Sequence, residues 1–195
     1  MKLSSGAKIG LMISTQTRAM DNAFNANTPA ELTISKVDKG VASVSYVYGP
    51  TQIEGKSNPK AKPKKGTGKI NMLGKIVQGD GQELQSLAPL SYPTEPKTIG
   101  DRWTAKTNLY SIFGTTAIDS VFRLVSVKKV GNREIAEVAV SMVGTGTFTI
   151  GGSGSFQIRC DDGLVDFARV VIRMSIGVGK DGRAVDTTTD IRRTK

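Results

Sequence analysis

The sequence contains no histidine and only one cysteine in 195 residues. Without an imidazole, the chain cannot form a serine–histidine triad, a histidine zinc site or a histidine acid–base pair. A single cysteine cannot close a disulfide within the chain or hold an iron–sulfur cluster. We therefore expect no metal and no cofactor, and we expect a protein that is not an enzyme.

Aromatic residues and long apolar runs are also scarce. Aromatic residues make up 6% of the chain and the hydrophobic set 38%, which supports a thin core. No run of about 18 apolar residues occurs, so no membrane-spanning helix is expected. The first residues do not resemble a hydrophobic leader. The expected location is the periplasm or the exterior if a leader has been removed, and otherwise the cytoplasm.

Acidic residues are few relative to basic ones, and the formal net charge is +10. Residues 1–75 hold 12 of the 27 basic residues but only 4 of the 17 acidic ones. Proline, lysine and glycine are concentrated at about residues 55–69, a composition that predicts an exposed basic loop. The candidate anion-binding residues are Lys56, Lys60, Lys62, Lys64, Lys65 and Lys69.

Such a lysine cluster attracts polyanions without choosing among nucleic acid, anionic lipid and acidic glycans. Residues 51–91 contain no aromatic residue and no arginine, so base stacking and base-edge recognition are not expected. The segment 65–70 also departs from a phosphate-binding loop, because Ile70 stands where that motif requires a hydroxyl. We favour a solvated loop, then an anionic surface as partner, and specific nucleic-acid recognition least.

Apolar residues alternate with period two along much of the chain, which is typical of half-buried strands. Between Phe148 and Cys160 the even positions are apolar or glycine and the odd positions are largely polar. The same pattern recurs at residues 9–13, 42–48, 136–142 and 168–178. It predicts a turn or bulge at the glycines of 151–154 and a core position for Cys160.

Turn signals separate these segments at Lys39-Gly40, Gly131-Asn132, Asp162-Gly163 and Asp181-Gly182. Residues 82–88 could form a short helix before Pro89. The pattern predicts one mainly β domain over residues 1–195. We expect a single curved antiparallel sheet, as a half-barrel or open barrel, with the short helix against it; a β-sandwich is the alternative.

Carboxylates and the single tryptophan are the remaining candidates for a site. The carboxylates gather at Asp161, Asp162 and Asp166 and again at Asp181, Asp186 and Asp190. Their spacing matches no calcium loop, so turn formation and, for Asp186 and Asp190, protection of an edge strand are favoured over catalysis. Trp103 is expected to anchor the core, with the wall of a ligand pocket as the alternative.

The segment from Pro93 to Trp103 reads Pro-x-x-Pro-x-x-x-Gly-Asp-x-Trp, and the strand pattern from Phe122 onward follows it. In this the chain resembles the uncharacterised β-rich domains of bacterial secreted proteins and lipoproteins. More distantly it is similar to half-barrel lipoprotein carriers, whose curved sheet cups apolar cargo. The resemblance implies no catalytic residue.

These observations favour a non-enzymatic envelope or secreted domain. It is expected to bind an apolar or anionic ligand, or a protein partner that is also an envelope component, in the concavity of its sheet. Two alternatives stay open. One is a structural or assembly subunit that uses sheet edges and the basic loop, and the other is a non-specific polyanion binder that uses the lysines.

Overall fold

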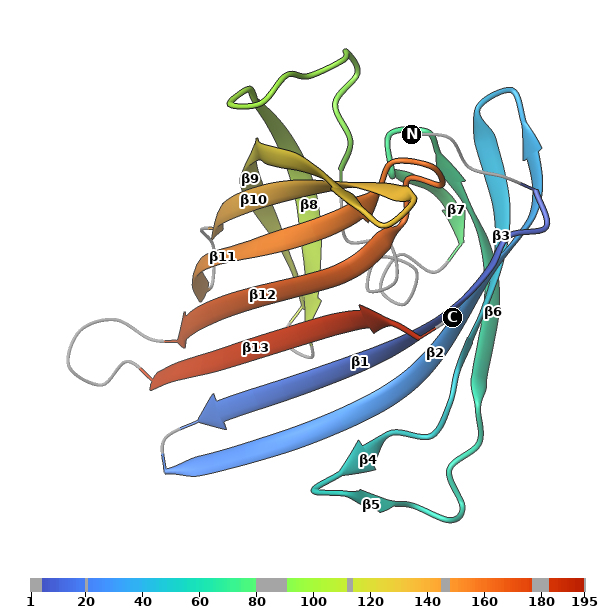
Figure 1. Cartoon of the computed structure of the whole chain (residues 1–195). Helices are drawn as coiled ribbons and strands as arrows, with labels where there is room; N and C mark the ends of the chain where they lie inside the picture. Colours follow the sequence, from blue (N-terminus) through green and yellow to red (C-terminus); the bar gives the residue numbers. More distant parts are fainter. Residues whose placement is uncertain are drawn as a thin grey trace.

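In the computed structural model, the strands form one antiparallel sheet that curls on itself (Figure 1). The structure describes residues 5–19, 21–79, 91–111, 114–144, 148–176 and 183–194. In its first half, the strands are β1 (Lys8–Ala19), β2 (Asn22–Asp38), β3 (Val41–Tyr48), β4 (Gln52–Ile53), β5 (Lys56–Ser57), β6 (Lys64–Asn71) and β7 (Ile76–Gly79). In its second half they are β8 (Arg102–Ser111), β9 (Gly114–Val130), β10 (Arg133–Gly144), β11 (Phe148–Arg159), β12 (Val165–Ile176) and β13 (Arg183–Arg193).

The main path of the sheet runs β7-β6-β3-β2-β1-β13-β12-β11-β10-β9-β8, with β4 and β5 attached beside β2. Most neighbours are consecutive hairpins, but β1 pairs with β13, so the first and last strands meet in the middle of the sheet. Among the described residues β7 and β8 do not pair, and the sheet stays open. This confirms the expected single curved sheet and excludes the β-sandwich.

Tight turns with positive φ angles connect the strands where the sequence predicted them. Lys39 and Gly40 adopt φ angles of 46° and 76° between β2 and β3, as a type I′ turn requires. Gly131 and Gly163 also have positive φ angles, at the β9–β10 and β11–β12 connections. The turn predicted at Asp181-Gly182 and the helix predicted at residues 82–88 lie outside the described residues. The described part of the chain contains no helix, and hence none long and apolar enough to cross a membrane.

A single apolar cluster joins strands that lie far apart in the sheet. Leu32 and Val44 of β2 and β3 belong to the same cluster as Phe122 of β9 and Phe156 of β11. Residues so distant along the sheet can share a core only because the sheet curls towards this face. We call the face that carries these residues the inner face and the opposite one the outer face.

Three local predictions differ from the structure. Gly151, Gly152 and Gly154 lie inside β11 and form no turn, and the register shift of that strand pair comes later, between Gln157 and Ile158. Cys160 is exposed, because β11 ends at Arg159 and the chain turns before the next inward position. The segment predicted as a loop at about 55–69 is exposed over most of its length, but it includes β5 and most of β6.

Candidate functional site

On β1, β2, β12 and β13 the inner face extends beyond the core, and none of its residues there whose side chains the structure describes is charged. Register partners on β2, β1, β13 and β12 form a continuous surface at the end of the sheet where β1 and β13 pair through Thr17 and Thr187. All its residues are half-buried except Phe24, which is 50% exposed. We call this surface the inner wall; it consists of Thr15, Thr17, Phe24, Ala26, Val170, Ile172, Met174, Val185, Thr187 and Thr189.

A second apolar cluster continues the inner wall across the sheet. Ile118 of β9 and Ile150 of β11 are buried, and Ile172 and Met174 of the inner wall pack against them. At the opposite margin, Ile53 of β4 is the register partner of Ala26 and is 56% exposed. A surface of apolar and threonine side chains therefore runs from the second cluster to the small β4–β5 hairpin.

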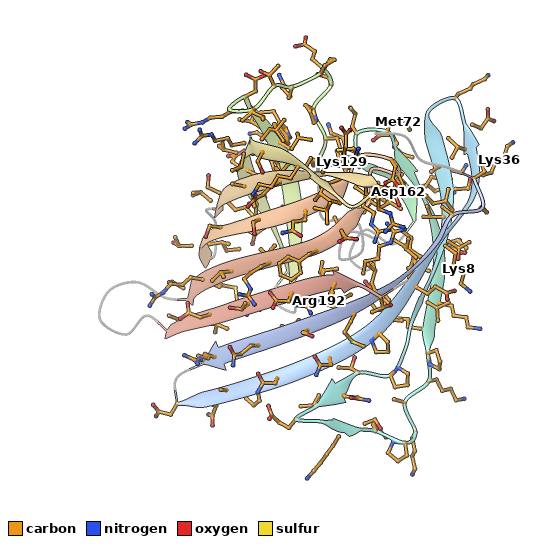
Figure 2. The ribbon with its side chains drawn as sticks, viewed as in Figure 1. Lys8, Lys36, Met72, Lys129, Asp162 and Arg192 are labelled. Carbon is orange, nitrogen blue, oxygen red and sulfur yellow. The ribbon has the colours of Figure 1, made fainter. Side chains whose placement is uncertain are left out.

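The outer face of the same strands is charged, and its charges are paired. Arg169 donates two hydrogen bonds to Asp190, at 2.7 and 2.6 Å. Four residues further along the same strands, Arg173 Nε lies 3.6 Å from an Asp186 oxygen. The guanidinium hydrogen bonds hold the pKa of the Asp190 carboxyl below its usual value. Further round the sheet, Lys8 pairs with Glu31 at 2.9 Å, and Figure 2 shows Lys8 pointing away from the interior.

These contacts give the clustered carboxylates structural roles. β13 lies between β1 and β12, so Asp186 and Asp190 do not sit on the edge strand that the sequence suggested. Asp162 accepts from Arg193 at 2.7 Å and from the Leu164 amide at 2.8 Å, and so fixes the turn that follows β11. Among the described residues no group of three or more acidic or cysteine side chains could hold a metal ion.

The candidate lysines do not form one patch. Lys56 of β5 is the register partner of Ile53 and so lies beside the exposed end of the inner wall. Lys60 and Lys62 lie in the exposed segment between β5 and β6. The other three lie along β6. Strand alternation places Lys64 on the inner face, as the register partner of Tyr48, and Lys65 and Lys69 on the outer face.

Trp103 lies on β8 and packs against the main core. Its ring stacks on Phe122 with centroids 5.4 Å apart and an interplanar angle of 13°. Its indole Nε1 donates to the Ser91 carbonyl oxygen at 2.8 Å. These contacts fit the expected core anchor, and Trp103 does not line the pocket described next.

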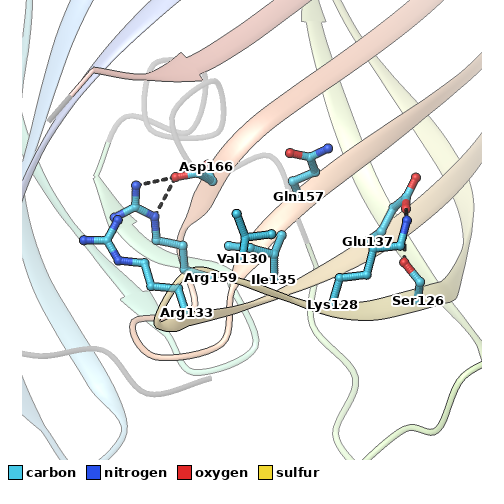
Figure 3. Close-up of a pocket in the computed structure, with 9 residues that line it drawn as sticks. All are labelled: Ser126, Lys128, Val130, Arg133, Ile135, Glu137, Gln157, Arg159 and Asp166. Atoms are coloured by element: carbon cyan, nitrogen blue, oxygen red, sulfur yellow. Dashed lines mark hydrogen bonds and ion pairs between the residues drawn. The ribbon is translucent and has the colours of Figure 1, made fainter.

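A pocket of about 210 Å³ lies on the outer face, across β9, β10, β11 and β12 (Figure 3). Arg133 and Arg159 lie at one end of it, Glu137 lies at the other, and Ile135 lies between them. Sequence reasoning missed this site. The sequence alternation indicates that Arg133, Ile135 and Glu137 point to the same face. It does not predict the register shifts that shape the pocket.

Fold and site together define an open, curled antiparallel sheet with an uncharged inner wall and ion pairs on the outer face of the same strands. No protein-family model matches the chain, and none of the curated proteins matches it. Among solved structures, the chain is similar to a Bacteroides fragilis protein described as exported and of YmcC-like fold, at 14% identity and a TM-score of 0.46, covering 100% of this chain and 98% of that one. It is also similar to the S-type phycobiliprotein lyase CPES from Guillardia theta, at 8% identity and a TM-score of 0.38, covering 98% and 89%. Neither similarity shows a family or a function for this chain.

Proposed function

We propose that this protein is a non-enzymatic binding protein that holds the acyl chain of an amphiphile against its inner wall. The observation that carries the proposal is the distribution of charge. Half-buried apolar and threonine side chains cover the inner wall, while the Arg169–Asp190 and Arg173–Asp186 pairs of β12 and β13 point outward. An uncharged surface that the core leaves half-exposed favours contact with an apolar ligand.

The margin of the inner wall suits an anionic head group. Phe24 and Ile53 are 50% and 56% exposed, and Lys56 lies opposite Ile53 in the β4–β5 hairpin. An ammonium beside exposed apolar side chains is the arrangement that an acyl chain ending in a carboxylate or phosphate would complement. We propose the cell envelope or the exterior as its location, consistent with the resemblance to secreted β-rich domains. Fractionation of cells that express the natural gene tests this.

Palmitate titration, followed by calorimetry, tests the binding function. Ile172→Arg places a guanidinium on the inner wall, and we expect it to weaken binding at least about tenfold, because an unpaired charge would then face the acyl chain. The matched control is Val171→Arg on the same strand, where the side chain points outward and is 41% exposed. The control should bind palmitate as the wild type does.

Thr187→Arg provides a second inner-wall variant, because Thr187 is the register partner of Ile172 on β13. Circular dichroism and thermal melting show which variants fold. Loss of affinity in a folded inner-wall variant, with Val171→Arg unchanged, supports the proposal. Absence of palmitate binding by the wild type, or equal affinities in folded inner and outer variants, contradicts it.

A further inference from the structure

The outer pocket is built by two irregularities of the sheet at the same level. Glu137 and Gln157 are register partners on β10 and β11. Beside Glu137 the β9 register skips one residue, Val125, and beside Gln157 the β12 register skips Asp166. Bulges bend strands and redirect side chains, and they occur often beside binding sites. Here they flank one residue pair and hollow an otherwise convex surface.

One end of this pocket carries an uncompensated positive charge. Arg159 and Ile135 are register partners, so Arg133 is the diagonal neighbour of Arg159 on the same face, and Figure 3 shows their guanidinium groups side by side. Asp166 accepts hydrogen bonds from Nε and Nη2 of Arg159, which leaves Nη1 for a further acceptor. Arg133 forms no ion pair with any residue that the structure describes. Two adjacent guanidiniums with one carboxylate favour a second anion.

The remainder of the lining is apolar at the centre, and its far end holds a carboxylate that is already paired. Ile135 is half-buried and Val130 is 63% exposed, so both offer apolar contact to a ligand. At the far end, Ser126 Oγ donates to Glu137 at 3.1 Å and Lys128 lies 3.8 Å from the same carboxylate. The Glu137 charge is therefore already offset within the protein. The anion site is at the arginine end.

We propose that the outer pocket binds a small organic carboxylate with an apolar body. The carboxylate would accept from Arg133 and from Nη1 of Arg159, and the body would cover Ile135 and Val130. The volume of about 210 Å³ is below the roughly 300–1,000 Å³ of sites for drug-sized ligands, so the ligand is correspondingly small. This site lies on the opposite face from the inner wall and is independent of the proposed acyl-chain function.

Phenylacetate is the probe, and side-chain and amide NMR shifts of residues 126–137 report binding at the pocket. Phenylacetamide, which keeps the ring and lacks the charge, tests the anion contact; inorganic phosphate, which lacks a body, tests the apolar contact. Arg133→Gln removes the unpaired guanidinium, and we expect it to weaken phenylacetate binding by about tenfold or more. Arg123→Gln is the matched control, because Arg123 is an exposed outward residue of β9 outside the pocket.

The proposal requires phenylacetate binding that Arg133→Gln weakens and Arg123→Gln leaves unchanged, with both analogues weaker than phenylacetate. The proposal is overturned if about 10 mM phenylacetate shifts no NMR signal of the pocket residues. It is also overturned if Arg133→Gln binds phenylacetate as tightly as the wild type does, or if either analogue binds as tightly as phenylacetate. Ile172→Arg leaves phenylacetate binding unchanged. Failure here is thereby distinguished from failure of the acyl-chain proposal.

Discussion

Successive residues of each strand point to the inner and the outer face in turn, yet the two faces differ in polarity and burial. The inner face divides into a buried core and a half-exposed, uncharged wall, and Arg193 of this face is paired with Asp162. The outer face is charged, and pairs such as Arg169 and Asp190 keep it compatible with water. The buried core therefore covers only part of the inner face, and the inner wall is the part that stays half-exposed. The uncovered part is the basis of the proposed function.

Truncation of a core side chain is expected to have the largest effect on stability. Leu32 is 0% exposed at the centre of the inner face, so Leu32→Ala should lower the free energy of unfolding by about 3 kcal/mol. Val121 points outward and is 40% exposed, and Val121→Ala should change it by less than about 0.5 kcal/mol. Urea denaturation measures both. Similar losses in the two variants would show that the faces are not distinct.

The glycines of β11 make the same comparison within one strand. A Cβ atom at Gly154 would lie 2.6 Å from the backbone oxygen of Arg169, whereas one at Gly151 would meet nothing within 4 Å. Gly154→Ala should therefore destabilise the fold by roughly 1–3 kcal/mol, and Gly151→Ala should be tolerated. Thermal melting of both variants tests this expectation, and an unaffected Gly154→Ala protein would contradict it.

The outer ion pairs give a pH-dependent effect. Because hydrogen bonds from Arg169 lower the Asp190 pKa in the folded state, the carboxylate stabilises the fold above its unfolded-state pKa. That contribution is lost as the pH falls through the lower, folded-state value. The wild-type protein should have a higher melting temperature than Asp190→Asn at pH 7, and this difference should disappear at acidic pH.

Asp186→Asn is the control, because its closest contact to Arg173 is 3.6 Å against 2.6 Å for Asp190 and Arg169. It should lower the melting temperature less. A gap for Asp190→Asn that does not change between pH 7 and pH 2 would argue against the pairing.

The smallest expected effect concerns the chemical reactivity of the Cys160 thiol. Its thiol is exposed, but partial desolvation and then the negative charge of Glu134 raise its pKa. Iodoacetamide should therefore label the folded protein at pH 7 more slowly than the unfolded chain. Glu134→Gln should speed the labelling modestly. Equal rates in folded and unfolded protein would exclude the shift.

The sequence predicted the faces well and the connections less well. Alternation such as Val138, Val140 and Met142 reports which side chains share a face, because that relation is local. It carries no information on which strands pair. The β1–β13 contact joins residues that are 166 to 182 positions apart in the sequence. Asp186 and Asp190 were therefore assigned to an edge strand, although β13 is central.

The candidate site was predictable only in part. Alternation together with curvature predicts that one face of the sheet turns inward, and the shared core of distant strands agrees with that. The lysines looked like a single loop in sequence, but β6 divides Lys64 from Lys65 and Lys69 between two faces. The outer pocket depends on register shifts at Val125 and Asp166, which arise from packing between strands.

A palmitate analogue with a nitroxide on its acyl chain tests the central claim most directly, through attenuation of methyl NMR signals. Ile172 and Val171 are adjacent on β12 and point to opposite faces, so one strand supplies both the probe and its reference. The inner-wall account predicts strong attenuation at Ile172, weaker attenuation at Val171 and none at Ile135. Equal attenuation at Ile172 and Val171, or the strongest attenuation at Ile135, would contradict it.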